Sequence, residues 1–332
     1  MACSEPSCRV GHMETTPFAE MQLSQLMLGT VQLGLPYGIA NRTGQPSYKE
    51  ALDILACAYE GGVNCLDTAA IYGASEEVLG RALDELGVAD EMVVISKVRH
   101  MAQGLDCATS AAIVEESVVE SLRRLRLEML PVCLFHVEDN FAYVEALLRL
   151  KERGLVRHIG SSAATPAAAQ EIIGTGLAEA LQIPSSVLDR RFQCPGGGII
   201  RASAQRGVAV FVRSVYLQGL LLMPEESIPL ELAAVRPSRR RLGSLAADAG
   251  MSLGELALRY ALGLDGISCV VVGVETREQM QQNLALFAKG ALPADLHQAA
   301  EEAVHELPET IILPRHWSQQ MAYPGRQEKP RG

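Results

Sequence analysis

The chain has 332 residues, of which 48% are hydrophobic and 20% charged, and its formal net charge at pH 7 is −10. This composition is typical of a globular protein with a sizeable core, and the acidic balance argues against nucleic acid or an anionic membrane as the main partner. No stretch approaches the roughly 18 consecutive apolar residues that a membrane span needs, and the first residues carry no apolar signal core. We therefore expect a cytoplasmic protein that works without membrane or nucleic-acid partners.

The sequence has eight cysteines and no C-x-x-C pair. Most of them lie in apolar runs, where a reduced thiol behaves as a small hydrophobic side chain, so we expect a reducing compartment. Cys3, Cys8 and His12 are potential metal ligands in the N-terminal segment, but they lack the paired spacing of zinc sites. We expect no metal centre.

Short β-rich runs alternate with longer helical patterns along almost the whole chain. Several runs, such as MVVIS, VAVFV and SCVVVG, are apolar without alternation, which is typical of strands buried on both faces of a parallel sheet. The segments between them, such as YKEALDILACAYEGG and SEEVLGRALDEL, carry apolar residues at helical spacing. The predicted strands are 26–31, 64–67, 92–97, 129–136, 156–160, 180–183, 208–213 and 268–273.

Alternating strands and helices with short links indicate an α/β protein built from βαβ units, and eight such units favour a closed (β/α)₈ TIM barrel. The competing architecture is a doubly wound open sheet. A dinucleotide-binding open sheet would show G-x-G-x-x-G between its first strand and helix. The segment after the first predicted strand here is GTVQLGLPYG, whose glycines have a different spacing. The barrel is therefore the prediction.

Two regions interrupt this rhythm. The segment 192–207 carries a glycine triplet and is predicted to be a mobile connection followed by a helix. Between the seventh strand and the C-terminus we expect extra loops and helices: a loop at 223–237, then helices in RRRLGSLAADAG and SLGELALRYALG, the second with a capping box of Ser252 and Glu255. The predicted organisation is a flexible tail at 1–20, one barrel domain at 21–307 and a C-terminal tail or loop at 308–332.

Four polar residues stand at or just after the ends of neighbouring predicted strands, where barrel active sites gather. Asp67 ends the second strand and Tyr72 follows five residues later, Lys97 ends the third strand, and His136 ends the fourth. Each residue alone has a structural alternative, such as a surface lysine, a core histidine or a helix-capping aspartate. Their coincidence at adjacent strand ends favours one functional cluster.

A phenol with an adjacent cation suits proton transfer at neutral pH. Bringing the pKa of a tyrosine from about 10 toward neutrality requires roughly 4 kcal/mol of stabilisation of the phenolate. A nearby ammonium group supplies much of that, and a carboxylate on its far side keeps the ammonium charged and in place. An imidazole can donate a hydrogen bond that orients a substrate oxygen. Tyr72 would then give a proton to an alkoxide or take one from an alcohol.

The stretch LDTAAIYGASEEVLGRAL, followed by ISK and LFH at matching distances, resembles the aldo-keto reductase family over about residues 20–307. The resemblance implies that Asp67, Tyr72, Lys97 and His136 form a catalytic tetrad. It also implies an NAD(P)-dependent oxidoreductase that interconverts a small-molecule carbonyl (aldehyde, ketone or sugar-like) and an alcohol. NADP(H) is the cofactor that the family implies first, and NAD(H) is the alternative.

The resemblance implies a cofactor that lies extended across the barrel mouth. The chain departs from the family pattern at Ala163, where asparagine is common, and at Arg213, where an aromatic residue is usual; a planar guanidinium can also stack on a ring. Ser161 and Ser162 have the alternative of capping the next helix. The cofactor-binding positions implied along the first seven strands are Gly29, Thr30, Asp67, Ser161, Ser162, Gln182, Arg213, Ser214, Val215, Leu217, Gln218 and Gly219.

After the eighth strand, GVETREQMQQNLA resembles the family segment around the adenosine 2′-phosphate. A Lys-Ser pair that is frequent in the family is absent there. Glu275 would repel a 2′-phosphate if it points inward, although Arg277 could compensate for it. The positions implied in this segment are Gly273, Glu275, Gln279 and Asn283.

Two other functions fit the same fold, because a fold does not fix a function. One is a non-catalytic or regulatory barrel that binds a nicotinamide nucleotide. The other is a redox-neutral epimerase that recycles its cofactor in place. The intact four-residue cluster favours an enzyme over the binding barrel, because a binding module has no need for a tuned phenol. Isotope exchange into the substrate without net cofactor consumption would identify the epimerase. Substrate identity depends on the loops at the barrel mouth, among them the one that carries His100, and no sequence pattern sets an oligomeric state.

Overall fold

Eight parallel strands close into a barrel in the computed structural model of the chain, which describes residues 13–317, and of 194–197 only the backbone. Their order around the barrel is β10-β3-β4-β5-β6-β7-β8-β9, so neighbours in the chain are neighbours in space and the last strand pairs with the first. The predicted (β/α)₈ barrel is confirmed. The strands are β3 (Leu26–Gly29), β4 (Cys65–Asp67), β5 (Val93–Val98), β6 (Leu130–Phe135), β7 (Val156–Ser162), β8 (Ala180–Pro184), β9 (Ala209–Arg213) and β10 (Cys269–Gly273).

The predicted strands differ from the observed ones by one or two residues at most of their ends. The first ends at Gly29 and not at residue 31, because the short helix α1 (Val31–Gly34) begins there. The fifth extends two residues further, through Ser162, because the backbone continues to pair with β8 up to Gln182. Differences of this size are ordinary where a strand passes into a loop.

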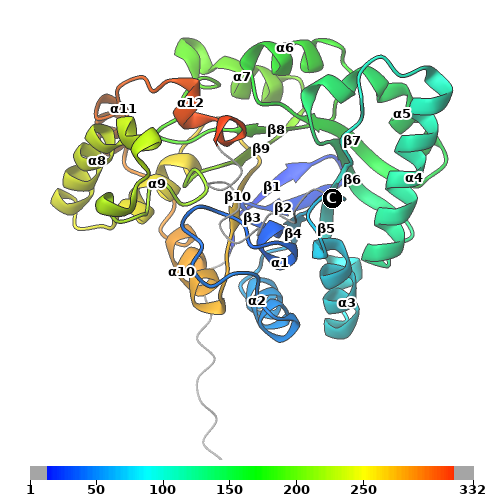
Figure 1. Cartoon of the computed structure of the whole chain (residues 1–332), viewed down its shortest axis with the longest axis horizontal. Coiled ribbons are helices and arrows are strands. Elements are labelled where there is room, and N and C mark those ends of the chain that lie inside the picture. Colours follow the sequence, from blue (N-terminus) through cyan, green and yellow to red (C-terminus); the bar gives the residue numbers. More distant parts are fainter. Residues whose placement is uncertain (1–12, 318–332) are drawn as a thin grey trace, which may run out of the picture.

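The helices form an outer ring around the strands (Figure 1). Helix α2 begins with a complete capping box, in which Ser47 and Glu50 satisfy each other's backbone N–H groups. The box predicted at Ser252 is half formed: Ser252 accepts from the Glu255 N–H, but the Glu255 carboxylate pairs with Arg259 and Lys289. The helices after α1 are α2 (Tyr48–Glu60), α3 (Ser75–Leu86), α4 (Cys107–Leu125), α5 (Val144–Glu152), α6 (Pro166–Gly174), α7 (Cys194–Gln205), α8 (Arg236–Asp248), α9 (Leu253–Leu262), α10 (Arg277–Phe287), α11 (Ala294–Glu302) and α12 (Glu309–Ile312).

Short 3₁₀ turns fill part of the connections between these elements. They are η1 (Ala89–Glu91), η2 (Glu138–Tyr143), η3 (Glu225–Ser227), η4 (Leu230–Val235) and η5 (Pro314–His316). The glycine triplet of the segment 192–207 lies inside α7. The prediction of a connection before a helix is therefore wrong for these glycines, because the helix begins before them. Among residues 13–317, no helix combines the length and apolar character that crossing a membrane requires.

An antiparallel hairpin of β1 (Thr15–Phe18) and β2 (Met21–Ser24) closes the amino-terminal end of the barrel. Phe18 packs at a ring-centroid distance of 4.8 Å on His158, near the start of β7, and Met21 and Leu23 join the core inside the barrel. The hairpin occupies the middle of the barrel in Figure 1. Residues 15–20, which the sequence placed in a flexible tail, therefore belong to the folded domain, because burial of this apolar face fixes them. Cys3, Cys8 and His12 lie outside the described residues.

The C-terminal segment also packs on the barrel as far as the described residues extend. Ile311, Ile312 and Trp317 are buried, and the indole Nε1 of Trp317 donates to the Ile311 carbonyl at 3.2 Å. Residues 309–317, the described part of the predicted C-terminal tail or loop, therefore pack on the barrel domain.

The strand side chains alternate between two cores, because successive residues of a strand point to opposite faces. One core lies between the strands and the helices. The other fills the barrel and holds Met27, Cys65, Ile95, Val132, Leu134, Ala180, Ala209, Phe211 and Cys269 from the strands. In each strand, the residue two positions after the last of these core residues therefore also points into the barrel, at the barrel's carboxyl end. This alternation decides which residues line the mouth.

Candidate active site

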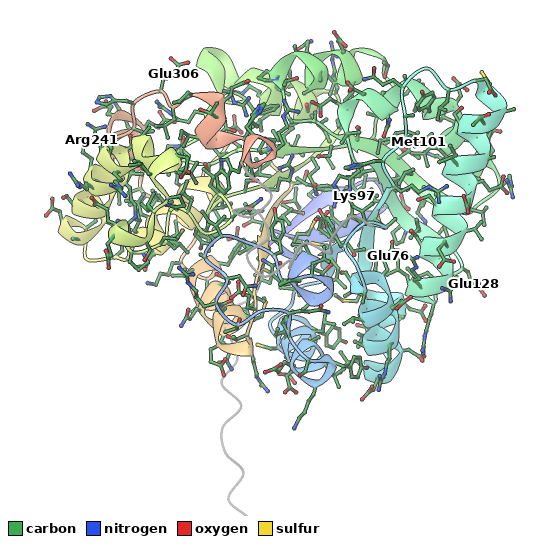
Figure 2. All side chains as sticks on the ribbon, in the orientation of Figure 1. Glu76, Lys97, Met101, Glu128, Arg241 and Glu306 are labelled. Carbon is green, nitrogen blue, oxygen red and sulfur yellow. The ribbon has the colours of Figure 1, made fainter. Side chains whose placement is uncertain are left out.

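The inward alternation brings three of the predicted catalytic residues to the carboxyl end of the barrel. Asp67 follows the inward Cys65 in β4, Lys97 follows the inward Ile95 in β5, and His136 comes directly after β6 on the face of Leu134. Figure 2 shows Lys97 toward the middle of the barrel, with Met101 on the segment that leaves β5. Three adjacent strands thus place a carboxylate, an ammonium group and an imidazole at one mouth.

Lys97 is held in place from two sides. Its Nζ atom lies 2.6 Å from Oδ1 of Asp67 and donates a 2.8 Å hydrogen bond to the carbonyl of Thr68. Only 2% of Lys97 and 5% of Asp67 is exposed, so the pair is screened little by solvent. The Nε2 atom of Gln182 in β8 donates to the same Asp67 oxygen at 2.7 Å. The ammonium group therefore has one fixed position at the base of the mouth.

Tyr72 lies in the loop between β4 and α3, and this loop is pinned to its surroundings by backbone hydrogen bonds. The Ala70 N–H donates to the Lys97 carbonyl, and the Ser75 N–H donates to the Tyr72 carbonyl. Helix α1 approaches so closely that a Cβ on Gly34 would stand 1.9 Å from the Tyr72 carbonyl oxygen. Gly73 has a φ of 57° and faces the Gly34 carbonyl, so both glycines are needed for this contact. The backbone of Tyr72 is consequently well fixed.

The Tyr72 ring faces both the lysine and the histidine. The Lys97 Nζ atom lies 5.0 Å from the centroid of the Tyr72 ring, and the His136 ring meets that ring edge to face at 5.6 Å between centroids. His100, which follows β5, packs edge to face on His136 at 4.9 Å. Sequence reasoning placed His100 in a loop at the mouth but not in contact with the catalytic cluster. Its position two residues after the end of a strand is the signal that could have found this contact.

The electrostatics of the cluster keep the imidazoles neutral. Burial lowers the pKa of His136 well below its ordinary value, and the nearby Lys97, His100 and Arg213 lower it further. Burial also lowers the pKa of His100. For Lys97, burial lowers the pKa while the Asp67 carboxylate opposes that change. A neutral imidazole keeps one ring nitrogen as a donor and one as an acceptor. Within residues 13–317, Nδ1 of His136 is buried and has no hydrogen-bond partner.

A second layer of buried polar groups supports the mouth from below. The Thr30 hydroxyl donates to the Asp67 carbonyl at 2.9 Å and lies 2.8 Å from the Ser75 hydroxyl, which in turn meets Thr68. The Thr30 hydroxyl is thus hydrogen-bonded within the protein, to groups of β4 and α3. This network links β3, β4 and the start of α3.

Glu76 is a buried acid that sequence reasoning did not single out. Only 1% of it is exposed, and its carboxylate accepts a 2.6 Å hydrogen bond from Ser96 and lies 3.5 Å from the Arg124 guanidinium. Arg124 also contacts the Ala70 carbonyl, in the loop that carries Tyr72. An acid in the first turn of a helix is ordinarily exposed, so the sequence holds no signal for this burial. The group positions α3 and α4 relative to the Tyr72 loop.

The segment after β9 has unusual backbone geometry. Ser214, Leu217 and Gln218 all have positive φ values (68°, 49° and 54°), although none of them is glycine. Such residues cost of order 1–3 kcal/mol each and cluster at functional sites. Gly219 approaches residues 38–40 so closely that a Cβ would stand 2.4 Å from that of Ala40. The segment 214–219 is therefore held in a conformation that its sequence does not favour.

Two glutamines near this segment end in buried oxygens that have no hydrogen-bond partner among the described residues. They are Oε1 of Gln32, whose amide lies against Gly273 at the end of β10, and Oε1 of Gln218. Unsatisfied buried polar atoms are rare in proteins and indicate groups that a ligand or solvent satisfies. Together with the strained segment 214–219, they fit an extended polar ligand such as a dinucleotide at this part of the mouth.

The remaining predicted cofactor positions divide by where their side chains lie. The side chains of Ser162 and Gln182 point into the barrel. The side chain of Ser161, which pairs with Leu181, points outward toward the helices. Gly29 and Gly273 are paired at the adjacent ends of β3 and β10. Val215 and Leu217 are buried apolar residues that offer only their backbones, Gln279 is exposed on α10, and Asn283 is buried there.

Glu275 lies just before α10 and is half-buried. Its carboxylate accepts a hydrogen bond from the Thr43 hydroxyl at 3.4 Å, and its backbone N–H donates to Gln279 at 2.7 Å. Burial raises the pKa of Glu275. Arg277, the residue expected to compensate for this acid, instead lies 4.0 Å from Glu60 of α2. The carboxylate therefore lacks the neighbouring cation that the sequence suggested.

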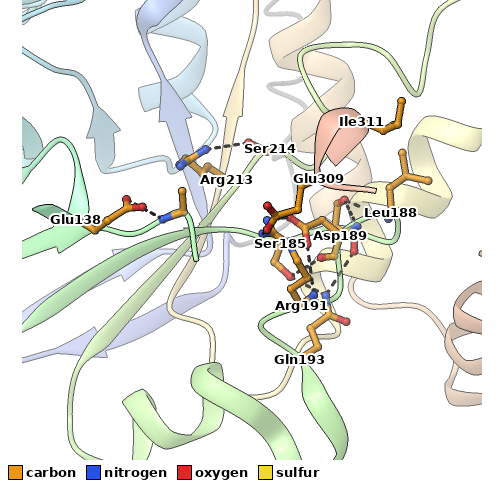
Figure 3. A network of polar contacts seen from close by, with 12 residues as sticks. Glu138, Ser185, Leu188, Asp189, Arg191, Gln193, Arg213, Ser214, Glu309 and Ile311 are labelled. Carbon is orange, nitrogen blue, oxygen red and sulfur yellow. Dashed lines mark hydrogen bonds and ion pairs between the residues drawn. The ribbon is translucent and has the colours of Figure 1, made fainter. Parts of the chain in front are cut away.

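A polar network on the other side of the mouth ties the C-terminal segment to the barrel (Figure 3). Arg191 pairs with both Asp189, after β8, and Glu309 of α12. Glu138 accepts a hydrogen bond from the Ala164 N–H, and Arg315 pairs with it at 3.3 Å. The loops after β6, β7 and β8 thereby form one rim with residues 309–315.

Comparison with known proteins agrees with this geometry. The model of the Aldo/keto reductase family matches residues 25–305. The oxidoreductase YqkF of Bacillus subtilis is 25% identical over 287 residues, which cover 80% of this chain and 88% of YqkF. L-galactose dehydrogenase of Arabidopsis thaliana is 28% identical over 298 residues, covering 80% and 84% of the two chains. The solved structure of aldo-keto reductase AKR11C1 from Bacillus halodurans in its holo form, 25% identical, superposes with a TM-score of 0.73 and covers 91% of this chain and all of that one. The chain belongs to the aldo/keto reductase family of oxidoreductases.

Proposed function

We propose that this oxidoreductase interconverts a small-molecule carbonyl and the corresponding alcohol with NAD(P)(H), and that Tyr72 is its general acid and base. The observation that carries the proposal is the arrangement around the Tyr72 ring, with the Lys97 ammonium 5.0 Å from its centroid and the His136 ring 5.6 Å away. A phenol, a cation and a neutral imidazole at one barrel mouth form a site that can hold a substrate oxygen and exchange a proton with it.

In the reducing direction each residue has one task. The His136 imidazole donates a hydrogen bond to the carbonyl oxygen and orients it toward Tyr72. When bound, the reduced nicotinamide supplies a hydride to the carbonyl carbon. The carbon–oxygen π bond breaks as the carbon gains the hydride, and the Tyr72 hydroxyl gives its proton to the oxygen. Lys97 stabilises the phenolate that remains until a proton from solvent restores the phenol.

Asp67 and Gln182 keep this lysine in position. A buried ammonium without a partner would lose its proton, because burial favours the neutral form. The Asp67 carboxylate at 2.6 Å opposes that loss, and Gln182 fixes the carboxylate. The Asp67 carboxylate therefore favours the charged form of the lysine that faces Tyr72.

The nicotinamide dinucleotide would be held by the inward residues of the later strands and by the segment after β9. Ser162 and Gln182 would bind the carboxamide, Arg213 would lie against the nicotinamide, and residues 214–219 would follow the pyrophosphate. The unpartnered Gln218 oxygen and the strained backbone at 214–218 support this placement. NADP(H) and NAD(H) both fit this part of the site, and the acid at 275 bears on the choice between them.

The decisive experiment separates proton transfer from binding. Purified protein is titrated with NADPH and NADH by fluorescence, and turnover is measured with activated aldehydes such as 4-nitrobenzaldehyde and with glyceraldehyde. We expect Tyr72→Phe to bind cofactor about as well as the wild type and to lose turnover by at least about a hundredfold, because only the transferable proton is removed. Tyr59→Phe is the matched control, since Tyr59 lies at the end of α2 and its hydroxyl bonds to Glu91 of η1, which precedes β5 at the amino-terminal end of the barrel.

Each alternative function has its own outcome in this experiment. Full turnover in Tyr72→Phe would contradict the proposed mechanism. Tight cofactor binding without turnover across the carbonyl panel would indicate a regulatory barrel. Isotope exchange into the substrate without net cofactor consumption would indicate a redox-neutral epimerase.

A further inference from the structure

Arg213 is a cation at the mouth that the proton-transfer chemistry does not use. It is the last residue of β9 and follows the inward Ala209 and Phe211, so its side chain leaves the strand toward the barrel axis. It is half-buried, and its charge acts on both Lys97 and His136, which are on the opposite strands of the mouth. Arg213 therefore shares the space in which the substrate carbonyl would be held.

This cation lacks an acidic partner. Within residues 13–317, its guanidinium makes one 3.3 Å hydrogen bond to the Ser214 hydroxyl, and no carboxylate lies within ion-pair distance of it. Figure 3 shows it pointing away from the Asp189–Arg191–Glu309 network. Asp67 pairs with Lys97 and Glu138 pairs with Arg315, while Glu275, after β10, accepts a hydrogen bond from Thr43 and does not pair with Arg213. With both imidazoles neutral, no ion pair compensates the positive charge of Arg213 within residues 13–317.

A hydride donor bound at the mouth must lie close to the charge of Arg213. The reacting atoms of a productive complex stand about 3–3.5 Å apart, so any ring that gives a hydride to a carbonyl held by Tyr72 and His136 lies in the same mouth. A nicotinamide ring is neutral when reduced and carries one positive charge when oxidised. A fixed cation nearby leaves the reduced ring almost unaffected and repels the oxidised one.

We propose that Arg213 makes the site discriminate between the redox states of its cofactor, binding the reduced nicotinamide dinucleotide more tightly than the oxidised one. The proposal rests on the proposed function, since it needs the nicotinamide at this mouth. It assigns to Arg213 a part that an aromatic residue at the same position could not play, because an aromatic ring carries no net charge.

The discrimination has a consequence for turnover. In carbonyl reduction, the oxidised cofactor that the reaction forms would dissociate from the site more readily than the reduced cofactor does. Release of a product limits the turnover rate of many enzymes, so a weaker hold on the oxidised form would favour a faster cycle. Arg213 would thus speed the replacement of the oxidised cofactor by the reduced one.

The test measures binding and needs no turnover. Dissociation constants for the oxidised and reduced forms of the same cofactor are measured by calorimetric titration, and their ratio is compared between variants. We expect the wild type to bind the oxidised form about tenfold or more weakly than the reduced form, an effect within reach of one unit charge in a partly buried site. Arg213→Gln should bring this ratio down by about tenfold.

Two variants serve as matched controls. Arg213→Lys keeps the positive charge and should keep most of the ratio. Arg201→Gln removes the same charge from an exposed ion pair with Asp265 and should leave the ratio unchanged. These controls separate a local field at the mouth from a change in the net charge of the protein.

The outcomes distinguish the two proposals. If both redox forms bind the wild type with equal affinity, the discrimination by Arg213 is overturned, even if Arg213→Gln fails to fold. An unchanged ratio in a folded Arg213→Gln also overturns it while leaving the proposed function intact. If neither redox form of NAD or NADP binds the wild type, the proposed function fails, and the role of Arg213 fails with it.

Discussion

Gln182 donates a 2.7 Å hydrogen bond from its Nε2 atom to Oδ1 of Asp67, the oxygen that also accepts from Lys97 at 2.6 Å. The two residues belong to β8 and β4, on different sides of the barrel, and 115 positions separate them in the chain. Through this bond, Asp67 links Lys97 to β8 on the opposite side of the barrel. The bond uses one N–H of the Gln182 amide, which leaves the second N–H and the side-chain oxygen for a nicotinamide carboxamide.

The Asp67–Lys97 pair should contribute to stability as well as to activity. Removing one partner of a buried ion pair leaves the other without compensation and typically costs about 3–5 kcal/mol. We expect Asp67→Asn to lower the free energy of unfolding in urea by about that amount and to abolish turnover. The double variant Asp67→Asn with Lys97→Met should recover most of the stability, because no charge is then buried alone, but none of the turnover.

A control for this prediction is Asp84→Asn, which breaks an exposed pair with Arg126 and should change stability little, because solvent screens such pairs. If Asp67→Asn proved as mild as this control, the carboxylate would not be holding a buried charge. Failure of the double variant to recover stability would mean that Asp67 acts mainly through its hydrogen bond with Gln182.

The buried imidazole of His136 should make stability depend on pH. Its pKa in the folded protein lies well below the ordinary value of 6.5, and Lys97, His100 and Arg213 face it. Below about pH 6.5 the unfolded chain therefore binds more protons at this residue than the folded one, so the unfolding free energy falls on acidification and is fully present above that pH. We expect His136→Asn to lose less stability than the wild type between about pH 7.5 and about pH 5.

Urea denaturation at these two pH values measures the effect. His100 and His297 also have lowered pKa values, so part of the pH dependence should persist in the variant. The exposed His305 offers the matched control, and His305→Asn should keep the full wild-type dependence. An identical dependence in His136→Asn and wild type would show that this imidazole is not held neutral by the fold.

Much of the barrel could be predicted from local patterns. Strands buried on both faces give apolar runs without alternation, so the strands predicted at 92–97 and 268–273 agree with β5 and β10 to within one residue. The polar residue that ends such a run marks the carboxyl end of a strand, which is why the sequence alone assigns Asp67 and Lys97 to the mouth. In a barrel of parallel strands, the carboxyl ends of all strands lie at the same end of the barrel, so the polar residues that end these runs are expected to lie together at the mouth.

Other features depend on contacts between distant segments and left no local signal. The hairpin of β1 and β2 has only four residues in each strand, and TTPF contains a proline, so its sequence resembles a tail. Its order comes from burial at the end of the barrel. Glu76 resembles any acid at the start of a helix, and its burial follows from Ser96 and Arg124, which come from other elements. The bond between Gln182 and Asp67 joins opposite strands and has no counterpart in sequence spacing.

The hairpin that closes the barrel should be a substantial source of stability. Phe18 is 4% exposed and packs on both His158 and Phe211. Deleting a buried phenylalanine side chain typically costs about 3–5 kcal/mol. We expect Phe18→Ala to lower the free energy of unfolding in urea by that amount, while cofactor binding at the opposite end of the barrel is retained. Thr15→Ala, at the exposed start of the hairpin, should have an effect within about 0.5 kcal/mol.

A small effect of Phe18→Ala would mean that the barrel remains closed without the hairpin side chain. Loss of cofactor binding in a folded variant would mean that the two ends of the barrel are coupled. Either result is read from the same two measurements, urea unfolding and fluorescence titration.

Glu275 should set the cofactor preference. The resemblance places the 2′-phosphate of NADP(H) in the segment after β10, where the structure has this half-buried carboxylate and where Arg277 lies against Glu60. A carboxylate repels a phosphate but can accept a hydrogen bond from a ribose hydroxyl. We therefore expect the wild type to bind NADH more tightly than NADPH, and Glu275→Gln to reduce that preference by about tenfold, or about 1.4 kcal/mol.

The test compares the dissociation constants of NADH and NADPH in wild type, Glu275→Gln and Glu278→Gln. Glu278 lies on the first turn of α10 and is exposed, so its removal takes away the same charge without opening the site. Because burial raises the pKa of Glu275, lowering the pH toward the weakly acidic range should protonate part of it and strengthen NADPH binding to the wild type more than to Glu275→Gln. A wild type that prefers NADPH at neutral pH would show that the carboxylate turns away from the bound phosphate, and the preference would then have to come from other residues of this segment.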